Sequence, residues 1–137
     1  AIIAVELRCS AKDVSLAVLG VPPDRFVVPW SETSVRGVTV SRLLSSKQLT
    51  LLQRKLVRIW PPGPYTLAAA TAQLCESILQ GTGIYGITCY AVLDGEFGVQ
   101  GKAIATAVTL DTSGITSVTE PTLNVREQVE LDNALHR

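Results

Sequence analysis

The carboxylates of this chain are the first candidates for chemistry, because two acids held close together can serve as general acid and general base. Asp94 and Glu96 lie two residues apart in "VLDGEFGV". A catalytic carboxyl needs apolar surroundings that raise its pKa, and the neighbouring sequence supplies no such cluster. Asp94-Gly95 is also a strong turn signal. The sequence therefore favours a solvated turn over an acid/base pair.

The other reactive side chains are three cysteines and one histidine. Cys9, Cys75 and Cys89 are odd in number and widely spaced, with no CxxC pair, which favours buried reduced thiols over a metal site. The single histidine, His136, falls in the last predicted helix. We expect no glycine-rich phosphate-binding loop, and neither GxxxxGK[ST] nor HExxH occurs. The residues alone predict no bound metal and no bound cofactor for this chain.

Composition predicts one domain with an apolar contact surface. A chain of 137 residues has single-domain length and can bury a sizeable core. Lys and Arg together number 12, as do Asp and Glu, so no basic stripe favours nucleic acid. Hydrophobic residues make up 47% of the chain but aromatic residues only 5%. This balance predicts an aliphatic core and apolar surface that a partner covers.

No stretch of the sequence approaches the ~20 apolar residues of a membrane span, and no signal peptide is recognisable. We therefore expect no membrane contact and a cytoplasmic location, with the mitochondrial matrix as the alternative. The chain contains no methionine, so Ala1 is not a translational start. We expect a processed product or a piece of a longer protein.

Hydrophobic periodicity predicts an α+β domain of antiparallel strands and packed helices. Leu49, Leu52 and Leu56 recur at helical spacing, and Asn124 with Glu127 forms a capping-box pattern. Gly81 is a natural helix end. The helices are expected at 1–9, 45–60, 66–80 and from 124 onward, and the strands at 14–19, 26–28, 35–40, 84–93, 103–110 and 115–120.

The order of several segments resembles the C-terminal, substrate-side domain of the NAD-dependent malate and lactate dehydrogenases. These segments are "KDVSLAVLG", "VVPW", "YTLAAATAQLCESIL", "VLDGEFGV", "TLDTSGI" and "LNVRE". The resemblance covers the chain from about Ala4 to Leu135 and implies the α+β fold of that domain over residues 1–137. It also implies NAD as cofactor of a full-length parent, whose nucleotide-binding Rossmann half is absent from this chain.

The resemblance gives the stretch "GVPPD" a particular meaning. The family's loop carries a catalytic histidine in a pattern like G-x-H-G-D. Gly20 and Asp24 match that pattern, whereas Pro22 stands at the histidine position and Pro23 at the following glycine. Histidine suits the reaction because its pKa lies near working pH, and proline has no titratable group. The resemblance thus implies no catalytic residue in this chain, with Asp24 retained from the loop motif.

Two further departures point the same way. The family's Asp and Arg, which orient the histidine and bind the substrate carboxylate, belong to a segment upstream of Ala1. The region from Leu44 to Tyr65 is shorter than in the family, and "PPGP" at 61–64 falls close to where family members approach the substrate.

Three functions stay open from the sequence. The first is a non-catalytic domain that packs against its own Rossmann half or in a homo-oligomer through the alanine-rich helix. The second is a fragment of an active NAD-dependent malate dehydrogenase, which would act on a 2-hydroxy acid such as malate. The third is a repurposed structural subunit of a larger assembly.

Overall fold

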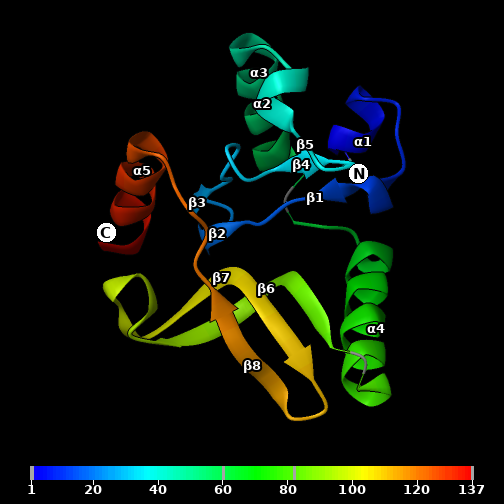
Figure 1. Cartoon of the computed structure of the whole chain (residues 1–137), viewed down its shortest axis with the longest axis vertical. Helices are drawn as coiled ribbons and strands as arrows, with labels where there is room; N and C mark the ends of the chain where they lie inside the picture. Colours follow the sequence, from blue (N-terminus) through cyan, green and yellow to red (C-terminus); the bar gives the residue numbers. More distant parts are fainter. Residues whose placement is uncertain (1, 60, 82, 137) are drawn as a thin grey trace.

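The computed structural model describes residues 2–59, 61–81 and 83–136, and it is a mixed α+β fold, as predicted (Figure 1). The helices are α1 (Ile2–Glu6), η1 (Ala11–Asp13), α2 (Val40–Leu43), α3 (Ser46–Arg58), α4 (Pro64–Gln80), η2 (Glu96–Gly98) and α5 (Val125–His136). The strands are β1 (Val14–Ser15), β2 (Leu19–Val21), β3 (Arg25–Val27), β4 (Ser34–Val35), β5 (Val38–Thr39), β6 (Ile84–Asp94), β7 (Gln100–Asp111) and β8 (Gly114–Thr119).

The first part of the chain forms a small lobe around a sheet of short strands. This sheet has the order β1-β4-β5, and α1, α2 and α3 lie around it (Figure 1). Its core contains the buried side chains of Ile3, Val35, Val40, Leu44 and Leu52. The burial of these aliphatic groups accounts for the lobe, because its strands are too short to be stable alone.

The larger sheet has the order β3-β2-β7-β6, with β8 also paired to β7. β7 is therefore the central strand, and its residues from Ile104 to Val108 are all buried. α5 packs on β2 and β3, where Leu131 and Leu135 join Leu19, Val27, Leu93 and Ile104 in one core. α4 contacts β7 near a second core of Ala91, Val108 and Leu110.

Local signals explain where the long helices begin and end. Ser45 and Gln48 form a capping box at the start of α3. Pro64 occupies the first turn of α4, where its missing N–H costs nothing, and Gly81 ends that helix at φ 62°. The capping box predicted at Asn124 and Glu127 is also present at α5. These positions confirm the predicted helices.

Two strand predictions are wrong in detail. The strand expected at 14–19 is two strands in different sheets, β1 and β2, because the chain crosses from the small lobe to the large sheet between them. The strand expected at 35–40 is instead a hairpin, β4 and β5, in which Arg36 and Gly37 both have positive φ. Val40, the last residue of that prediction, begins α2.

The side chains of α4 are only partly covered by the rest of the chain. Leu74 and Ile78 are half-buried, but Leu67 and Thr71 are exposed, and Ser77 is the buried residue of this helix. Leu79 is 82% exposed and Tyr65 is 89% exposed. Figure 1 shows α4 at the side of the molecule, in contact with the sheet along one edge. Most of its surface therefore faces outward.

Candidate functional site

The loop that the sequence singled out is the turn of a short hairpin. β2 and β3 are antiparallel, with Val21 opposite Arg25, and Pro22, Pro23 and Asp24 connect them. β2 also pairs with the central strand through Gly20 and Ala105. The turn is thus attached directly to the rigid middle of the larger sheet.

Gly20 is required by this geometry. Its φ is +104°, and a Cβ placed on it would lie 2.6 Å from the backbone oxygen of Arg25. Only glycine adopts that backbone conformation without strain and lets β3 approach this closely. The glycine shared with the family's loop motif therefore has a structural role here.

Pro22 and Pro23 line an apolar cavity of about 200 Å³. Its other walls come from the β2–β3 region and from the end of α3 and the segment after it, namely Val18, Phe26, Leu56, Val57, Ile59 and Pro62. The backbone oxygen of Pro22 lies 3.5 Å from the hydroxyl of Tyr90, a long and weak hydrogen bond. None of the eight lining side chains can take up or release a proton.

Asp24 lies in a different cavity. It is exposed and lines a depression of about 440 Å³ together with Arg25, Gln53 and Glu130, on the side where β3 meets α5. The two halves of the turn thus border neighbouring cavities that share Phe26 as a wall, with Asp24 lining one and Pro22 the other. His136, at the end of α5, has Nδ1 3.0 Å from the backbone oxygen of Asp132 in its own helix.

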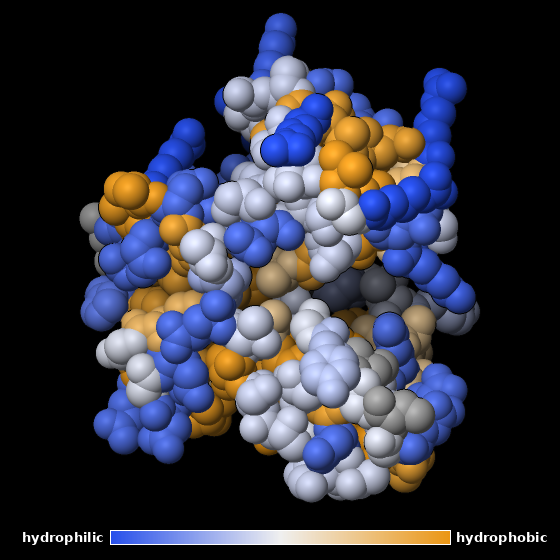
Figure 2. Space-filling model, viewed as in Figure 1, coloured by the Kyte–Doolittle hydropathy of each residue, from blue (hydrophilic) through white to orange (hydrophobic). Residues whose placement is uncertain are grey.

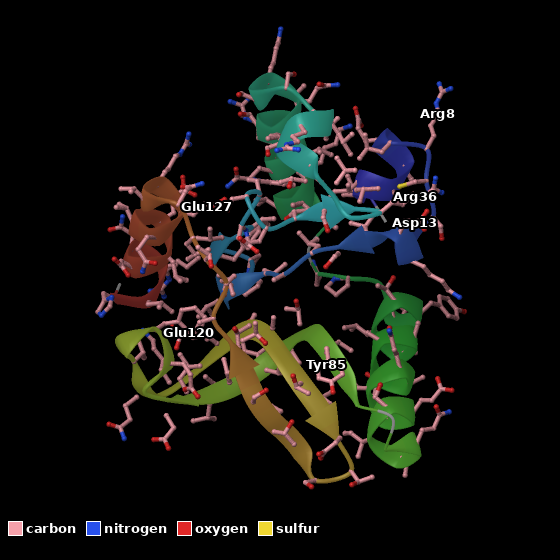
Figure 3. The ribbon with its side chains drawn as sticks, in the orientation of Figure 1. Arg8, Asp13, Arg36, Tyr85, Glu120 and Glu127 are labelled. Carbon is pink, nitrogen blue, oxygen red and sulfur yellow. The ribbon has the colours of Figure 1, made fainter. Side chains whose placement is uncertain are left out.

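Glu127 has a larger role than the capping box that the sequence predicted. It is 5% exposed, and its carboxylate accepts hydrogen bonds from the backbone N–H and hydroxyl of Ser31 as well as from the N–H of Asn124. In Figure 3 it lies at the start of α5, facing the segment that follows β3. No local pattern signals the Ser31 contact, because the two residues are 96 positions apart.

Asp13 and Arg36 form an ion pair at the small lobe, away from Glu127 (Figure 3). Two guanidinium nitrogens of Arg36 donate to the same carboxylate oxygen, at 3.0 and 2.8 Å. These bonds lower the pKa of Asp13 from its usual value. The pair joins η1 to the β4–β5 turn and is a structural contact.

The remaining candidates are also structural. The side chain of Glu96 accepts from the N–H of Asp94 at 2.6 Å, as expected of a turn. Cys9, Cys75 and Cys89 are free thiols, but the prediction that they are buried is wrong, because Cys75 is exposed and Cys9 and Cys89 are only half-buried. Partial burial raises the pKa of Cys89. Within the described ranges, no three His, Cys, Asp or Glu side chains gather as metal ligands. No helix of the described part is both long and apolar enough to cross a membrane.

The segment "GTGIYG", residues 81–86, has the glycine spacing GxGxxG. The prediction that the chain has no glycine-rich loop does not take this segment into account. In a dinucleotide-binding site a strand enters this motif and a helix leaves it, so the helix N-terminus faces the pyrophosphate. Here α4 enters and β6 leaves. The glycines therefore follow the carbonyl end of a helix, which disfavours an anion, and the spacing gives no phosphate site.

The chain has relatives among known dehydrogenases. No protein-family model matches the chain. The malate dehydrogenase of Geotalea uraniireducens is 32% identical over 98% of this chain, and the L-lactate dehydrogenase 2 of Listeria innocua is 26% identical over 97%. The first alignment runs over 154 positions, more than the 137 residues available, so this chain has deletions relative to that enzyme.

Solved structures agree on the fold. The malate dehydrogenase of Salinibacter ruber has a TM-score of 0.83 at 28% identity, over 97% of this chain and 46% of that one. The malate dehydrogenase of Aeropyrum pernix has a TM-score of 0.90 at 22% identity, over 98% of this chain. A lactate dehydrogenase of Cryptosporidium parvum, solved with lactic acid and nicotinamide adenine dinucleotide, has a TM-score of 0.85 at 25% identity.

The chain spans about half the length of the curated relatives that it matches, 48% in the Geotalea uraniireducens enzyme and 46% in the Listeria innocua enzyme. Nearly all of its own residues are covered by each of them. In sequence and in fold, the chain is therefore a homologue of the malate and lactate dehydrogenases that corresponds to their C-terminal domain.

Proposed function

We propose that residues 1–137 form one domain, the counterpart of the substrate-side half of a 2-hydroxy-acid dehydrogenase, and that this domain does not perform the proton transfer of the family. Its role is to pack, either against a nucleotide-binding half or against a second copy of itself. NAD and a 2-hydroxy acid such as malate are ligands only of an active parent.

The proposal rests on the proline at position 22. The family resemblance assigns the proton-carrying histidine to this position, and proline has no group that can take up or release the hydroxyl proton as hydride moves. The neighbours of Pro22 in its cavity are apolar side chains, and none of them replaces the imidazole. The remaining carboxylate of the loop, Asp24, borders a different space.

A packing role is supported by the surface of α4. Ala68, Ala69, Ala70 and Ala72 are all exposed, and helical spacing places Ala68 and Ala72 on the same face as the exposed side chains of Tyr65 and Leu79. Small side chains let another helix or sheet approach closely. Soluble monomers rarely expose continuous apolar surface of this kind, so a partner that covers α4 stabilises the domain.

An active dehydrogenase is the second candidate, favoured by the named activities of relatives that match 98% and 97% of the chain. This alternative needs a proton carrier from outside these residues. A structural subunit of a larger assembly is the third, and it shares with the first the prediction that α4 is a contact surface.

Association and ligand binding test the proposal on this chain. We expect sedimentation at tens of micromolar protein to give a dimer or larger species. Ala69→Leu should weaken association, because overpacking a close contact costs ~1–3 kcal/mol. Ala11→Leu, at an exposed alanine outside α4, is the control. Calorimetry should detect binding of neither NAD nor NADH. A clean monomer would contradict packing against a second copy, and a micromolar dissociation constant for NAD would contradict the proposal that this chain binds no cofactor.

A further inference from the structure

We propose that the cavity beside Pro22 is a binding site for one small, uncharged, ring-sized apolar molecule. The inference rests on the proposed function, because it concerns the space that the family resemblance assigns to the catalytic loop. It goes further in naming what this space accepts in the present chain.

Three separate segments line the cavity, which is open to solvent beside Val57 and Ile59, 50% and 56% exposed. Val18 immediately precedes β2, Phe26 lies in β3, and Pro22 and Pro23 come from the turn between these strands. Leu56 and Val57 come from the last turn of α3. Ile59 and Pro62 follow that helix. A hairpin fixed to the central sheet and the end of a capped helix thus form the opposing walls, so the site does not depend on a single loop.

The apolar walls of the cavity disfavour a charged ligand. All eight lining side chains are hydrocarbon, and three of them are prolines, which offer no backbone N–H. A carboxylate transferred into such a space loses its hydration and gains no cationic or hydrogen-bonding partner, which is strongly unfavourable. An uncharged ring gains from the same transfer, because apolar surface leaves water.

The volume fits a single ring. The cavity measures about 200 Å³. An engineered apolar cavity of ~150 Å³ in another protein stays dry and binds benzene. A molecule of one six-membered ring with a small apolar substituent therefore fills the space beside Pro22 without displacing its walls, whereas a 2-hydroxy acid finds no partner for its carboxylate.

Toluene and benzoate form the sharpest pair of probes, because they share one ring and differ in a methyl group against a carboxylate. We expect toluene to shift the methyl resonances of Val18, Leu56 and Val57 saturably in a carbon–proton NMR titration of the purified chain. The dissociation constant should be on the order of 1 mM, typical of a ligand with few atoms. Benzoate should shift these resonances at least about tenfold more weakly.

Substitutions in α3 distinguish toluene binding in this cavity from nonspecific binding to the protein surface. Val57 and Leu51 lie on the same helix and are similarly exposed, at 50% and 49%, but only Val57 lines the cavity. Val57→Lys should weaken toluene binding at least about tenfold, because it introduces a charge, and Leu51→Lys should leave binding unchanged. The milder Val57→Thr, nearly the same in shape, should weaken binding in the same direction.

Each outcome decides the inference. Benzoate binding as tightly as toluene would overturn it, as would Val57→Lys and Val57→Thr both binding toluene like the unaltered chain. Absence of saturable shifts up to the solubility of toluene would also overturn it. These results would leave the proposed loss of proton transfer intact. Conversely, malate oxidation by the full-length gene product would contradict the proposed function whatever toluene does.

Discussion

The Glu127 carboxylate ties the start of α5 to Ser31, since it accepts from both the backbone N–H and the hydroxyl of that residue. Ser31 follows the β2–β3 hairpin, so this contact fixes the last helix beside the strands that it covers. The same carboxylate accepts from the N–H of Asn124, which caps the helix. One buried acid therefore stabilises both the helix end and its packing.

Glu127→Gln should destabilise the fold by roughly 1–3 kcal/mol, because the amide NH2 of Gln donates where the carboxylate accepted, so at least one part-buried N–H or O–H donor loses its partner. Glu130→Gln is the matched control on the same helix. Glu130 pairs with Arg126, whose side chain is largely exposed, and such pairs contribute at most ~1 kcal/mol. Urea denaturation measures both changes. Equal midpoints for Glu127→Gln and the unaltered chain would refute the role given to this contact.

Gly20→Ala should be more damaging than a change at another glycine of positive φ. Gly101 has φ +71° with no atom near its missing Cβ, so Gly101→Ala incurs only the left-handed backbone strain of roughly 1–2 kcal/mol. At Gly20 the added carbon also meets the Arg25 oxygen, and such overpacking adds ~1–3 kcal/mol. Thermal or urea unfolding of the two variants compares the costs. A Gly20→Ala variant as stable as Gly101→Ala would show that the hairpin relaxes freely.

The Asp13–Arg36 pair predicts a pH dependence of definite sign. Hydrogen bonds from Arg36 lower the pKa of Asp13 in the folded chain, so folding favours the charged carboxylate. The stabilisation is complete above the unfolded pKa of about 3.9 and is lost as the pH falls through the lower folded pKa. Asp13→Asn should therefore be less stable than the unaltered chain at neutral pH, with a gap that closes on acidification.

Urea midpoints of both proteins at several pH values measure that gap. Because the pair is exposed, the gap should be small and should shrink in high salt. A gap that is constant or widens as the pH falls would mean that the carboxylate of Asp13 is not the source of the stabilisation.

The sequence predicts the local elements better than the long-range ones. Ser45 with Gln48 and Asn124 with Glu127 are short-range capping signals, and both helices begin where these signals place them. The mostly aliphatic run at 14–19 predicts a single strand. Its division between two sheets depends on the pairing of Val14 with Val35 in one sheet and of Gly20 with Ala105 in the other, and both partners lie beyond the reach of a local pattern.

The surroundings of the candidate site residues are also beyond prediction from the sequence. The family resemblance picks out Pro22 and Asp24 from the order of motifs, without information about their surroundings. The cavity beside Asp24 is lined by Gln53 of α3 and Glu130 of α5, and the cavity beside Pro22 by the end of α3. The surroundings of the two residues therefore depend on long-range packing. Figure 2 shows polar and apolar side chains interspersed over the surface seen in this view, so hydropathy alone does not reveal these spaces.

The central claim is that Pro22 leaves the loop without a proton carrier, and the rate of NADH formation from malate and NAD tests it most directly. The assay uses the full-length gene product, unaltered, and follows absorbance. Loss of a general acid/base typically reduces turnover by ~10²–10⁴-fold, so the account predicts no rate above background. Turnover of ~1 s⁻¹, the low end of ordinary enzymes, would contradict it and would mean that another residue does the work of the histidine.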